Sequence, residues 1–217
     1  MGNFAVIGAK IFGYYLATAL GSKGHEVLVL DIRDAPIQRI KNEVDQAVVA
    51  DATDKQVLAA LGIQDADAAV VCIGSNMQAS ILVTLHLKEI GVQRILARAK
   101  SEDHGRILKK VGADEIYFPQ KDLGLNLAAK LDNPNMIDYL PFMKGYSIIE
   151  IRPPKTFHRK TLKELDLINR FGVQILAVRS AESGEITFIP TAAYQVRGPD
   201  SLIALGPEKA LAQIQKF

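Results

Sequence analysis

The chain has 217 residues, 48% of them apolar and 23% charged, a composition that is typical of soluble globular proteins and excludes a disordered or fibrous chain. Twenty-six basic and 24 acidic residues leave a net charge of +2, which is too balanced for a protein that binds nucleic acid or a membrane surface through its overall charge. The single cysteine, Cys72, excludes an intrachain disulfide and fits a reducing compartment, and no apolar run approaches the roughly 18 residues of a membrane-spanning helix.

The first two thirds of the chain alternate short apolar runs with helical patterns. The runs are apolar on both faces, which favours buried parallel strands, and they cover residues 3–7, 26–30, 47–49, 68–73, 94–97 and 115–118. Helical patterns lie between them at residues 12–22, 37–42, 54–61, 77–90 and 107–111, and a glycine follows four of these helices. This alternation predicts an α/β fold, a Rossmann-like doubly wound parallel sheet with right-handed crossovers.

The pattern changes after residue 131. Residues 132–145 contain asparagine, proline and glycine in close succession and predict a hinge or connecting segment. Beyond it we expect strands at 146–151, 173–178, 186–189 and 201–205, the middle two forming a hairpin, and short helices at 161–165 and 207–215. The predicted organisation is therefore a Rossmann-like domain over 1–131, a connecting segment over 132–145, and a small α+β domain over 146–217.

The first predicted strand runs into a glycine-containing turn at residues 8–13 and then into a helix, and Asp31 closes the second strand. The start of such a helix presents backbone N–H groups to an anion, and an acidic side chain at the next strand end can accept hydrogen bonds from ribose hydroxyls. This order predicts a mononucleotide or dinucleotide site. Lys10 stands where the usual turn has its second glycine, so its Cβ crowds a pyrophosphate; its ammonium either lies beside a phosphate or points to solvent.

Two further strand ends lie at the same edge of the predicted sheet, where ligands bind in open α/β folds. Asp51 and Thr53 follow the third strand, and residues 72–76 end the fourth. We expect Asp51 to contact the ligand, and we expect Thr53 and Asn76 chiefly to cap the helices that follow them.

Several short motifs occur together along the chain. They are FAVIG at 4–8, FG at 12–13, GHEV at 24–27, DATD at 51–54, IGSNMQAS at 73–80, ARA at 97–99, GAD at 112–114 and PQKD at 119–122, with residues 160–178 and 201–206 in the tail. With these motifs the chain resembles, over nearly its whole length, the RCK (regulator of K+ conductance) regulatory subunits of the Ktr and Trk potassium-uptake systems, of the KtrA/TrkA-like type.

The resemblance implies a cytosolic, non-enzymatic regulatory subunit that binds an adenine nucleotide, namely ATP, ADP, AMP, NAD or NADH, and gates a membrane potassium-translocating subunit. It also implies a homodimer that assembles into a ring, expected to be an octamer, on the inner face of the cell membrane. No nucleic acid partner, catalytic residue or metal site is implied. The residues implied to bind the cofactor are Gly8, Ala9, Lys10, Ile11, Phe12, Gly13, Asp31, Ile32, Arg33, Asp51, Ala52, Thr53, Ile73, Gly74, Asn76, Arg98 and Gln120.

The roles implied for these residues follow from their positions in the family pattern. Asp31 would hold the ribose, and Asp51 and Ala52 would flank the adenine. Ala9 and the two turn glycines would line the phosphates, and Arg98 would lie near the phosphates or the dimer seam.

Three departures from the family pattern lie on the phosphate side. Lys10 replaces the second glycine, Ile11 replaces an arginine that reaches the terminal phosphate, and Gln120 replaces a glutamate that helps hold a divalent cation. Losing one charge-assisted phosphate contact costs roughly 1.5–3 kcal/mol, which weakens the expected preference for ATP. Ile168 and Gln174 stand where family members that bind cyclic di-AMP have arginine and asparagine, so we do not predict that ligand.

Two other functions stay open on the residues alone: an NAD-linked oxidoreductase, and a nucleotide sensor of another transporter. An oxidoreductase needs a proton donor beside its substrate. His158, in the C-terminal part, lies in a loop rich in proline, lysine and arginine and is interpreted as a surface residue. Turnover of NADH would favour the enzyme, and co-purification with a membrane protein would favour a regulatory role.

Overall fold

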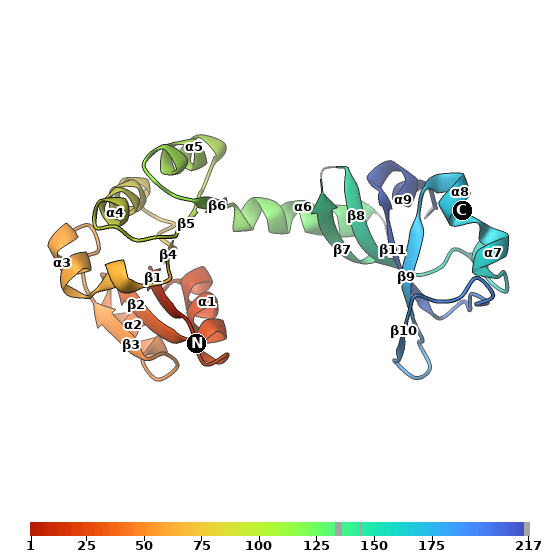
Figure 1. The fold of residues 1–217 in the computed structure, drawn as a ribbon, viewed down its shortest axis with the longest axis horizontal. Coiled ribbons are helices and arrows are strands. Elements are labelled where there is room, and N and C mark those ends of the chain that lie inside the picture. Colours follow the sequence, from red (N-terminus) through yellow and green to blue (C-terminus); the bar gives the residue numbers. More distant parts are fainter. Residues whose placement is uncertain (133–135, 144, 215–217) are drawn as a thin grey trace. The chain divides into compact units, whose positions relative to one another are not determined.

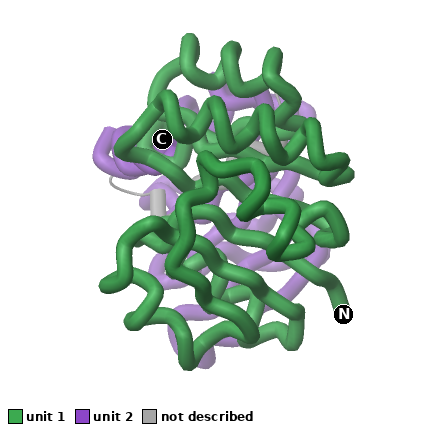
Figure 2. Tube along the Cα trace, turned by 90° about the vertical axis from the view of Figure 1, so that its left-hand side faces the viewer, with its two compact units in different colours: residues 1–121 green, residues 122–217 purple. Residues whose placement is uncertain are grey.

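The computed structural model describes residues 1–132, 136–143 and 145–214 of the chain. The chain divides into two compact units, Met1–Lys121 and Asp122–Phe217, which Figure 2 shows in different colours. Each unit has its own sheet and its own hydrophobic core (Figure 1). None of the helices in the described part of the chain has the length and apolar character needed to span a bilayer.

The first unit is built on a six-stranded parallel sheet in the order β3-β2-β1-β4-β5-β6. Its strands are β1 (Asn3–Ile7), β2 (Glu26–Asp31), β3 (Gln46–Val49), β4 (Ala68–Val71), β5 (Ile95–Arg98) and β6 (Glu115–Tyr117). The chain first builds outward from β1 to β3 and then returns to the other side of β1, so the order reverses between β1 and β4. This confirms the predicted doubly wound sheet, and the β1–β4 boundary is its topological switch point.

Helices cover both faces of this sheet. They are α1 (Ile11–Gly21), α2 (Asp34–Ile40), α3 (Lys55–Ala60), α4 (Met77–Glu89) and α5 (Glu102–Lys110), with a 3-10 turn, η1 (Ile63–Asp65). Successive side chains of a strand point to opposite faces. Val6 of β1 therefore packs in one cluster with Ala17 of α1 and Ile37 of α2, whereas Ile7 packs in another with Leu58 of α3.

Some element ends differ from those predicted. The helix predicted at 107–111 begins earlier, at Glu102, because the Ser101 hydroxyl caps it by accepting a hydrogen bond from the backbone N–H of His104 at 3.2 Å. Helix α2 likewise begins at Asp34 rather than at residue 37, and β4 ends at Val71, before the chain turns into the candidate site.

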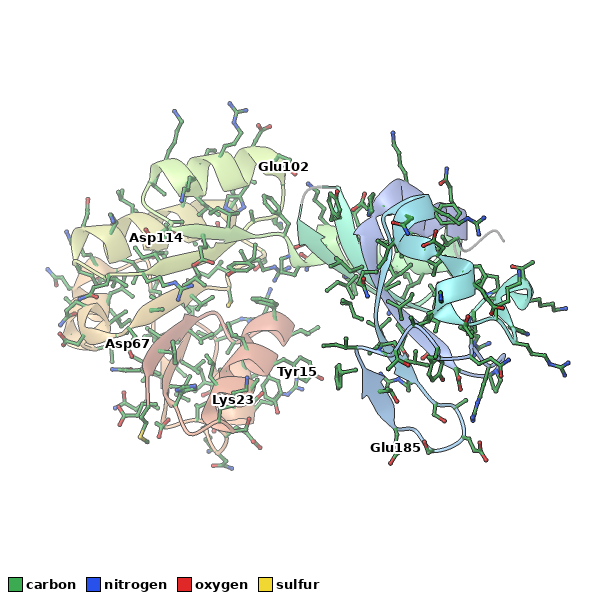
Figure 3. All side chains as sticks on the ribbon, turned by 45° about the vertical axis from the view of Figure 1, so that its right-hand side comes forward. Tyr15, Lys23, Asp67, Glu102, Asp114 and Glu185 are labelled. Atoms are coloured by element: carbon green, nitrogen blue, oxygen red, sulfur yellow. The ribbon has the colours of Figure 1, made fainter. Side chains whose placement is uncertain are left out.

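Two aspartates pin the amino ends of neighbouring strands in this sheet. Asp67 precedes β4 and accepts a hydrogen bond from the N–H of Asn3 at 2.8 Å, and Asp114 precedes β6 and accepts one from the N–H of Ile95 at 2.7 Å (Figure 3). Both carboxylates lie at the amino ends of the parallel strands, opposite to the carboxyl ends that form the candidate site.

The second unit is built on an antiparallel sheet in the order β10-β9-β11-β8-β7. Its strands are β7 (Met136–Met143), β8 (Tyr146–Ile151), β9 (Gln174–Arg179), β10 (Ile186–Phe188) and β11 (Ser201–Pro207). The helices after the sixth strand are α6 (Pro119–Asp132), α7 (Leu162–Leu165), α8 (Leu167–Phe171) and α9 (Glu208–Ile214), with η2 (Lys155–Phe157). Ile149, Ile151 and Leu202 are buried in its core. The predicted α+β architecture and the β9–β10 hairpin are confirmed.

The connecting segment predicted over 132–145 is wrong for Met136–Met143, which form β7 and pair with β8. Helices α6 and α8 were also not predicted. Residues 133–135 and 144 of the predicted segment, and residue 215 of the last predicted helix, lie outside the described residues. The domain limits at 131 and 146 stay a prediction.

Candidate nucleotide-binding site

A pocket of about 240 Å³ lies at the carboxyl ends of β1, β2, β3 and β4. The predicted cofactor residues that line it are Gly8, Lys10, Asp31, Ile32, Arg33, Asp51, Ala52, Thr53, Ile73, Gly74 and Asn76. The predicted residues that do not line it are Ala9, Ile11, Phe12, Gly13, Arg98 and Gln120. The lining residues that the prediction missed are Ile7, Leu30, Ala50, Cys72, Ser75 and Ala79. All of these except Ala79 are next in sequence to a predicted residue. They could therefore have been found by including every residue at the carboxyl ends of the predicted strands.

The turn between β1 and α1 requires glycine at two positions. Gly8 has a φ of 104°, a left-handed conformation that side chains rarely adopt. Gly13 lies so close to the turn that a Cβ there would stand 1.9 Å from the carbonyl oxygen of Gly8. The first glycine therefore shapes the turn and the last lets α1 pack against it, while Lys10 is free to carry a side chain.

Asp31 is the buried acid of the site. It is 8% exposed, and its carboxylate accepts hydrogen bonds from the N–H of Ala9 at 2.9 Å and from the N–H of Arg33 at 3.0 Å. Burial acts to raise the pKa of this carboxyl, but the hydrogen bonds from Arg33 and Ala9 outweigh burial and hold the pKa below its ordinary value. Asp31 is therefore ionised at neutral pH and ties the glycine turn to the end of β2.

The Arg33 side chain forms a two-point ion pair with Asp31. Its Nε donates to Oδ1 and its Nη2 donates to Oδ2, both at 3.0 Å. The arginine side chain is 47% exposed, whereas that of Asp31 is 7% exposed, so the ion pair extends from the carboxyl end of β2 to solvent. A ribose hydroxyl that reaches Asp31 has to share or replace one of these bonds.

The turns after β3 and β4 are organised by their own polar side chains. The Asp51 carboxylate accepts hydrogen bonds from the N–H of Thr53 at 2.9 Å and from its hydroxyl at 2.7 Å, and these bonds lower the pKa of Asp51. Asn76 caps α4 by accepting from the N–H of Ala79 at 3.1 Å, as predicted. The capping role predicted for Thr53 is wrong, because Asp54 caps α3 and Thr53 instead closes the Asp51 turn.

Lys10 reaches across the pocket. Its Nζ donates a hydrogen bond to the hydroxyl of Ser75 at 3.0 Å, and both residues line the pocket. The bond is exposed, and whether the ammonium lies beside a phosphate stays a prediction. The bond joins the turn that begins α1 to the turn that precedes α4.

The residues that were predicted but do not line the pocket lie around it or away from it. Ile11, at the start of α1, is 73% exposed. The Arg98 guanidinium packs on Gly74, where an added Cβ would lie 2.6 Å from Nη1, and lies 6.0 Å from the centre of the Phe12 ring. Gln120 lies in the first turn of α6.

Cys72 lines the pocket with a neutral thiol. Its side chain is buried, and burial raises the pKa of the thiol to about 12, an effect that the nearby Arg98 charge partly offsets. The thiolate is the reactive form of cysteine, so this thiol does not act as a nucleophile at neutral pH.

The pattern of domains defines the class of protein. Residues 4–119 match the TrkA-N domain and residues 146–217 match the TrkA-C domain, in the order that the two units have in the chain. The chain is therefore a protein with a TrkA-N domain followed by a TrkA-C domain.

Curated relatives place the chain more narrowly. It is 35% identical over 214 residues to Ktr system potassium uptake protein C of Bacillus subtilis (strain 168), covering 99% of this chain and 96% of that protein. It is 34% identical over 213 residues to Ktr system potassium uptake protein A of the same organism, covering 98% and 95%. The chain belongs to the family of TrkA-N and TrkA-C domain proteins that includes the Ktr system potassium uptake proteins, which confirms the resemblance found in its motifs.

Solved structures share the fold. The GsuK RCK domain superposes with a TM-score of 0.67 at 20% identity, over 99% of this chain and 47% of that chain. The GsuK channel bound to NAD gives 0.55 at 22% identity, over 100% and 38%. GsuK bound to ADP gives 0.51 at 26% identity, over 60% and 33%. The chain therefore spans less than half the length of these GsuK chains.

Proposed function

We propose that the chain is the nucleotide-binding regulatory subunit of a membrane potassium-uptake system, with an adenine nucleotide bound at the carboxyl ends of β1–β4. The observation that carries this proposal is the ionised, buried Asp31 beside the glycine turn, in a chain that is similar over its whole length to Ktr system potassium uptake proteins. GsuK structures with NAD and with ADP support an adenine nucleotide as the ligand.

The proposed binding mode follows from the lining residues. The Asp31 carboxylate accepts the ribose hydroxyls, and Asp51 and Ala52 flank the adenine. The phosphates face the start of α1, where the positive end of the helix favours an anion. No bond needs to break for this function, because a ligand that binds one conformation better than another shifts the equilibrium between them.

The chemistry of the pocket supports a regulatory role over catalysis. The pKa values of Asp31 and Asp51 lie below their ordinary range and that of the Cys72 thiol is about 12, so none of the three exchanges a proton near neutral pH. Within the described parts of the chain, no histidine lines the pocket. These groups are poor candidates for the proton donor that an NAD-linked oxidoreductase would need.

The partners in this proposal are a membrane potassium-translocating subunit and further copies of the chain. We infer a homodimer that assembles into a ring, an octamer, on the inner face of the membrane, as the resemblance to RCK regulatory subunits implies. The names of the Ktr relatives support a potassium-uptake system as the partner. Exposed leucines on two helices offer apolar surface for such contacts. They are Leu82 and Leu85 on α4, and Leu123, Leu125, Leu127 and Leu131 on α6.

Potassium flux with and without nucleotide tests the proposal. The purified chain is added to vesicles that contain a Ktr-type membrane subunit, and flux is measured with ADP, with ATP and without nucleotide. We expect flux to depend on the chain and to change with the nucleotide. A folded chain that binds no adenine nucleotide by calorimetry, or that never alters flux, would contradict the proposal.

A further inference from the structure

The pocket lies over the ends of β1–β3 and extends across the switch point only as far as β4. A dinucleotide at the switch point of such a sheet lays one nucleoside over β1–β3 and the other over β4 and the strands beyond it. The lining residues come from the ends of β1 to β4, and of the residues that the structure describes, none from the ends of β5 or β6 lines the pocket. The volume of about 240 Å³ lies below the roughly 300–1,000 Å³ of sites for drug-sized ligands, which suits one nucleoside better than two.

Lys10 lies on the border between the two halves. Its side chain starts at the residue before α1 and ends on Ser75, in the turn after β4, so it crosses the switch point itself. In a dinucleotide site this position is a glycine, which lets the backbone approach the pyrophosphate that links the two nucleosides. Here the four-carbon lysine side chain, beginning with its Cβ, stands on that path.

Arg98 occupies the space on the other side of this border. Its guanidinium lies over the Cα of Gly74, since a Cβ added there would be 2.6 Å from Nη1 and 2.8 Å from Cζ. The same group lies 6.0 Å from the centre of the Phe12 ring on α1. A second nucleoside laid over the ends of β4 and β5 would have to displace this packed side chain.

The border also carries positive charge. Lys10 and Asn76 are the N-terminal caps of α1 and α4, which have 11 and 13 residues, and both caps line the pocket. Two positive helix ends and the Lys10 ammonium therefore meet at one place. The Lys10–Ser75 bond is exposed, so the ammonium can turn from the hydroxyl to a phosphate at little cost.

We propose that Lys10 and Arg98 restrict the site to adenine mononucleotides, whose phosphates end at Lys10, and exclude dinucleotides such as NAD. This inference rests on the proposed function and narrows its ligand. It makes Lys10 a specificity residue in place of the turn glycine that a dinucleotide needs.

Calorimetry with ADP and with NAD on the full chain tests the inference. We expect the wild type to bind ADP at least about 30-fold more tightly than NAD. Lys10→Gly should bring the two affinities to within about threefold, because NAD binding improves while ADP binding weakens. The variant should fold, since Lys10 makes no side-chain capping bond and glycine is accepted at an N-terminal cap.

Three further variants separate the contributions of side-chain bulk and of charge. Lys10→Met keeps the chain length without the ammonium, so it should still exclude NAD while binding ADP about tenfold more weakly. Lys23→Met, at the opposite end of α1 (Figure 3), is the matched control and should leave both affinities unchanged. Arg98→Ala should likewise improve NAD binding relative to the wild type.

The outcomes distinguish this inference from the proposed function. If the folded wild type binds ADP and NAD equally tightly, or if Lys10→Gly leaves their ratio unchanged, the inference is overturned and the proposed function stands. If the folded wild type binds neither, the proposed function falls and the inference falls with it.

Discussion

Replacing Asp31 with asparagine removes the charge at the centre of the site and keeps the size of the side chain. The carboxylate accepts hydrogen bonds from the Ala9 N–H, the Arg33 N–H and the Arg33 guanidinium, whereas an asparagine has one acceptor oxygen. A hydrogen bond to a charged group contributes about 1.5–3 kcal/mol, so the loss of the ribose contact should weaken ADP binding roughly 10- to 150-fold in calorimetry.

The same substitution should lower the stability of the first unit. It leaves a buried donor such as the Ala9 N–H without its partner, at a cost of about 1–3 kcal/mol. Because the pKa of Asp31 is lower in the folded protein than in the unfolded chain, its carboxylate adds stability above the unfolded pKa, and that stability is lost as the pH falls through the folded pKa. Urea unfolding should therefore depend less on acidification in the variant than in the wild type.

Asp67→Asn is the matched control for this experiment. Asp67 holds one backbone N–H, that of Asn3, at the amino edge of the same sheet, and asparagine can still accept that bond (Figure 3). We expect its affinity for ADP to equal that of the wild type. Unchanged ADP affinity in Asp31→Asn, or an equal loss in both variants, would refute the assignment of Asp31 to the ribose.

Three further predictions follow from the contacts around the pocket. Gly13→Ala places a Cβ 1.9 Å from the carbonyl oxygen of Gly8 and should lower the free energy of unfolding in urea by about 1–3 kcal/mol. Gly124→Ala on α6, where an added Cβ meets nothing within 4 Å, is the control and should not destabilise the protein. Equal stabilities of the two variants would show that α1 shifts freely to make room. Ile11 offers no donor to a terminal phosphate, and Gln120 offers a neutral amide where a cation favours a carboxylate. Calorimetry should therefore find AMP, ADP and ATP within about tenfold of one another, and a strong magnesium-dependent preference for ATP would contradict this. The buried thiol of Cys72, with a pKa of about 12, should resist iodoacetamide at pH 8 until the chain unfolds, and rapid labelling of the folded chain would count against its burial.

The sheet of the first unit could be predicted because its strands are buried on both faces and therefore appear as continuous apolar runs. Strand β7 could not be predicted in this way. Its sequence contains Pro141, which argues against a central strand. Among the described residues, however, β7 lies at the edge of its sheet and pairs only with β8, and a residue without an N–H is tolerated there. Helix α5 was predicted too short because its first turn is charged and contains Gly105, so apolar spacing begins only at Ile107.

The candidate site was predictable in its position but not in its contacts. The glycine turn and Asp31 mark a strand end that binds ligands, whichever way the neighbouring side chains point. Whether Arg33 turns inward to Asp31 or outward to solvent, and whether Lys10 reaches Ser75, depends on side-chain geometry across residues that are distant in sequence. Lys10 and Ser75 are 65 positions apart, so no local pattern could indicate that bond.

Two side-chain contacts hold the pocket together, and in the proposed binding mode a nucleotide shares or replaces both. Arg33 occupies both carboxylate oxygens that a ribose needs, and Lys10 bonds to Ser75 where a phosphate would end. In the proposed binding mode a nucleotide exchanges partners at both ends of the site: ribose for guanidinium on Asp31, and phosphate for hydroxyl on Lys10. Its affinity is the difference between these sets of contacts. The Lys10–Ser75 bond joins the turn after β1 to the turn after β4, across the switch point. If a phosphate replaces Ser75 as the partner of Lys10, the ligand would connect the two halves of the sheet in place of that bond. A ligand whose contacts differ between two conformations in this way can shift the equilibrium between them.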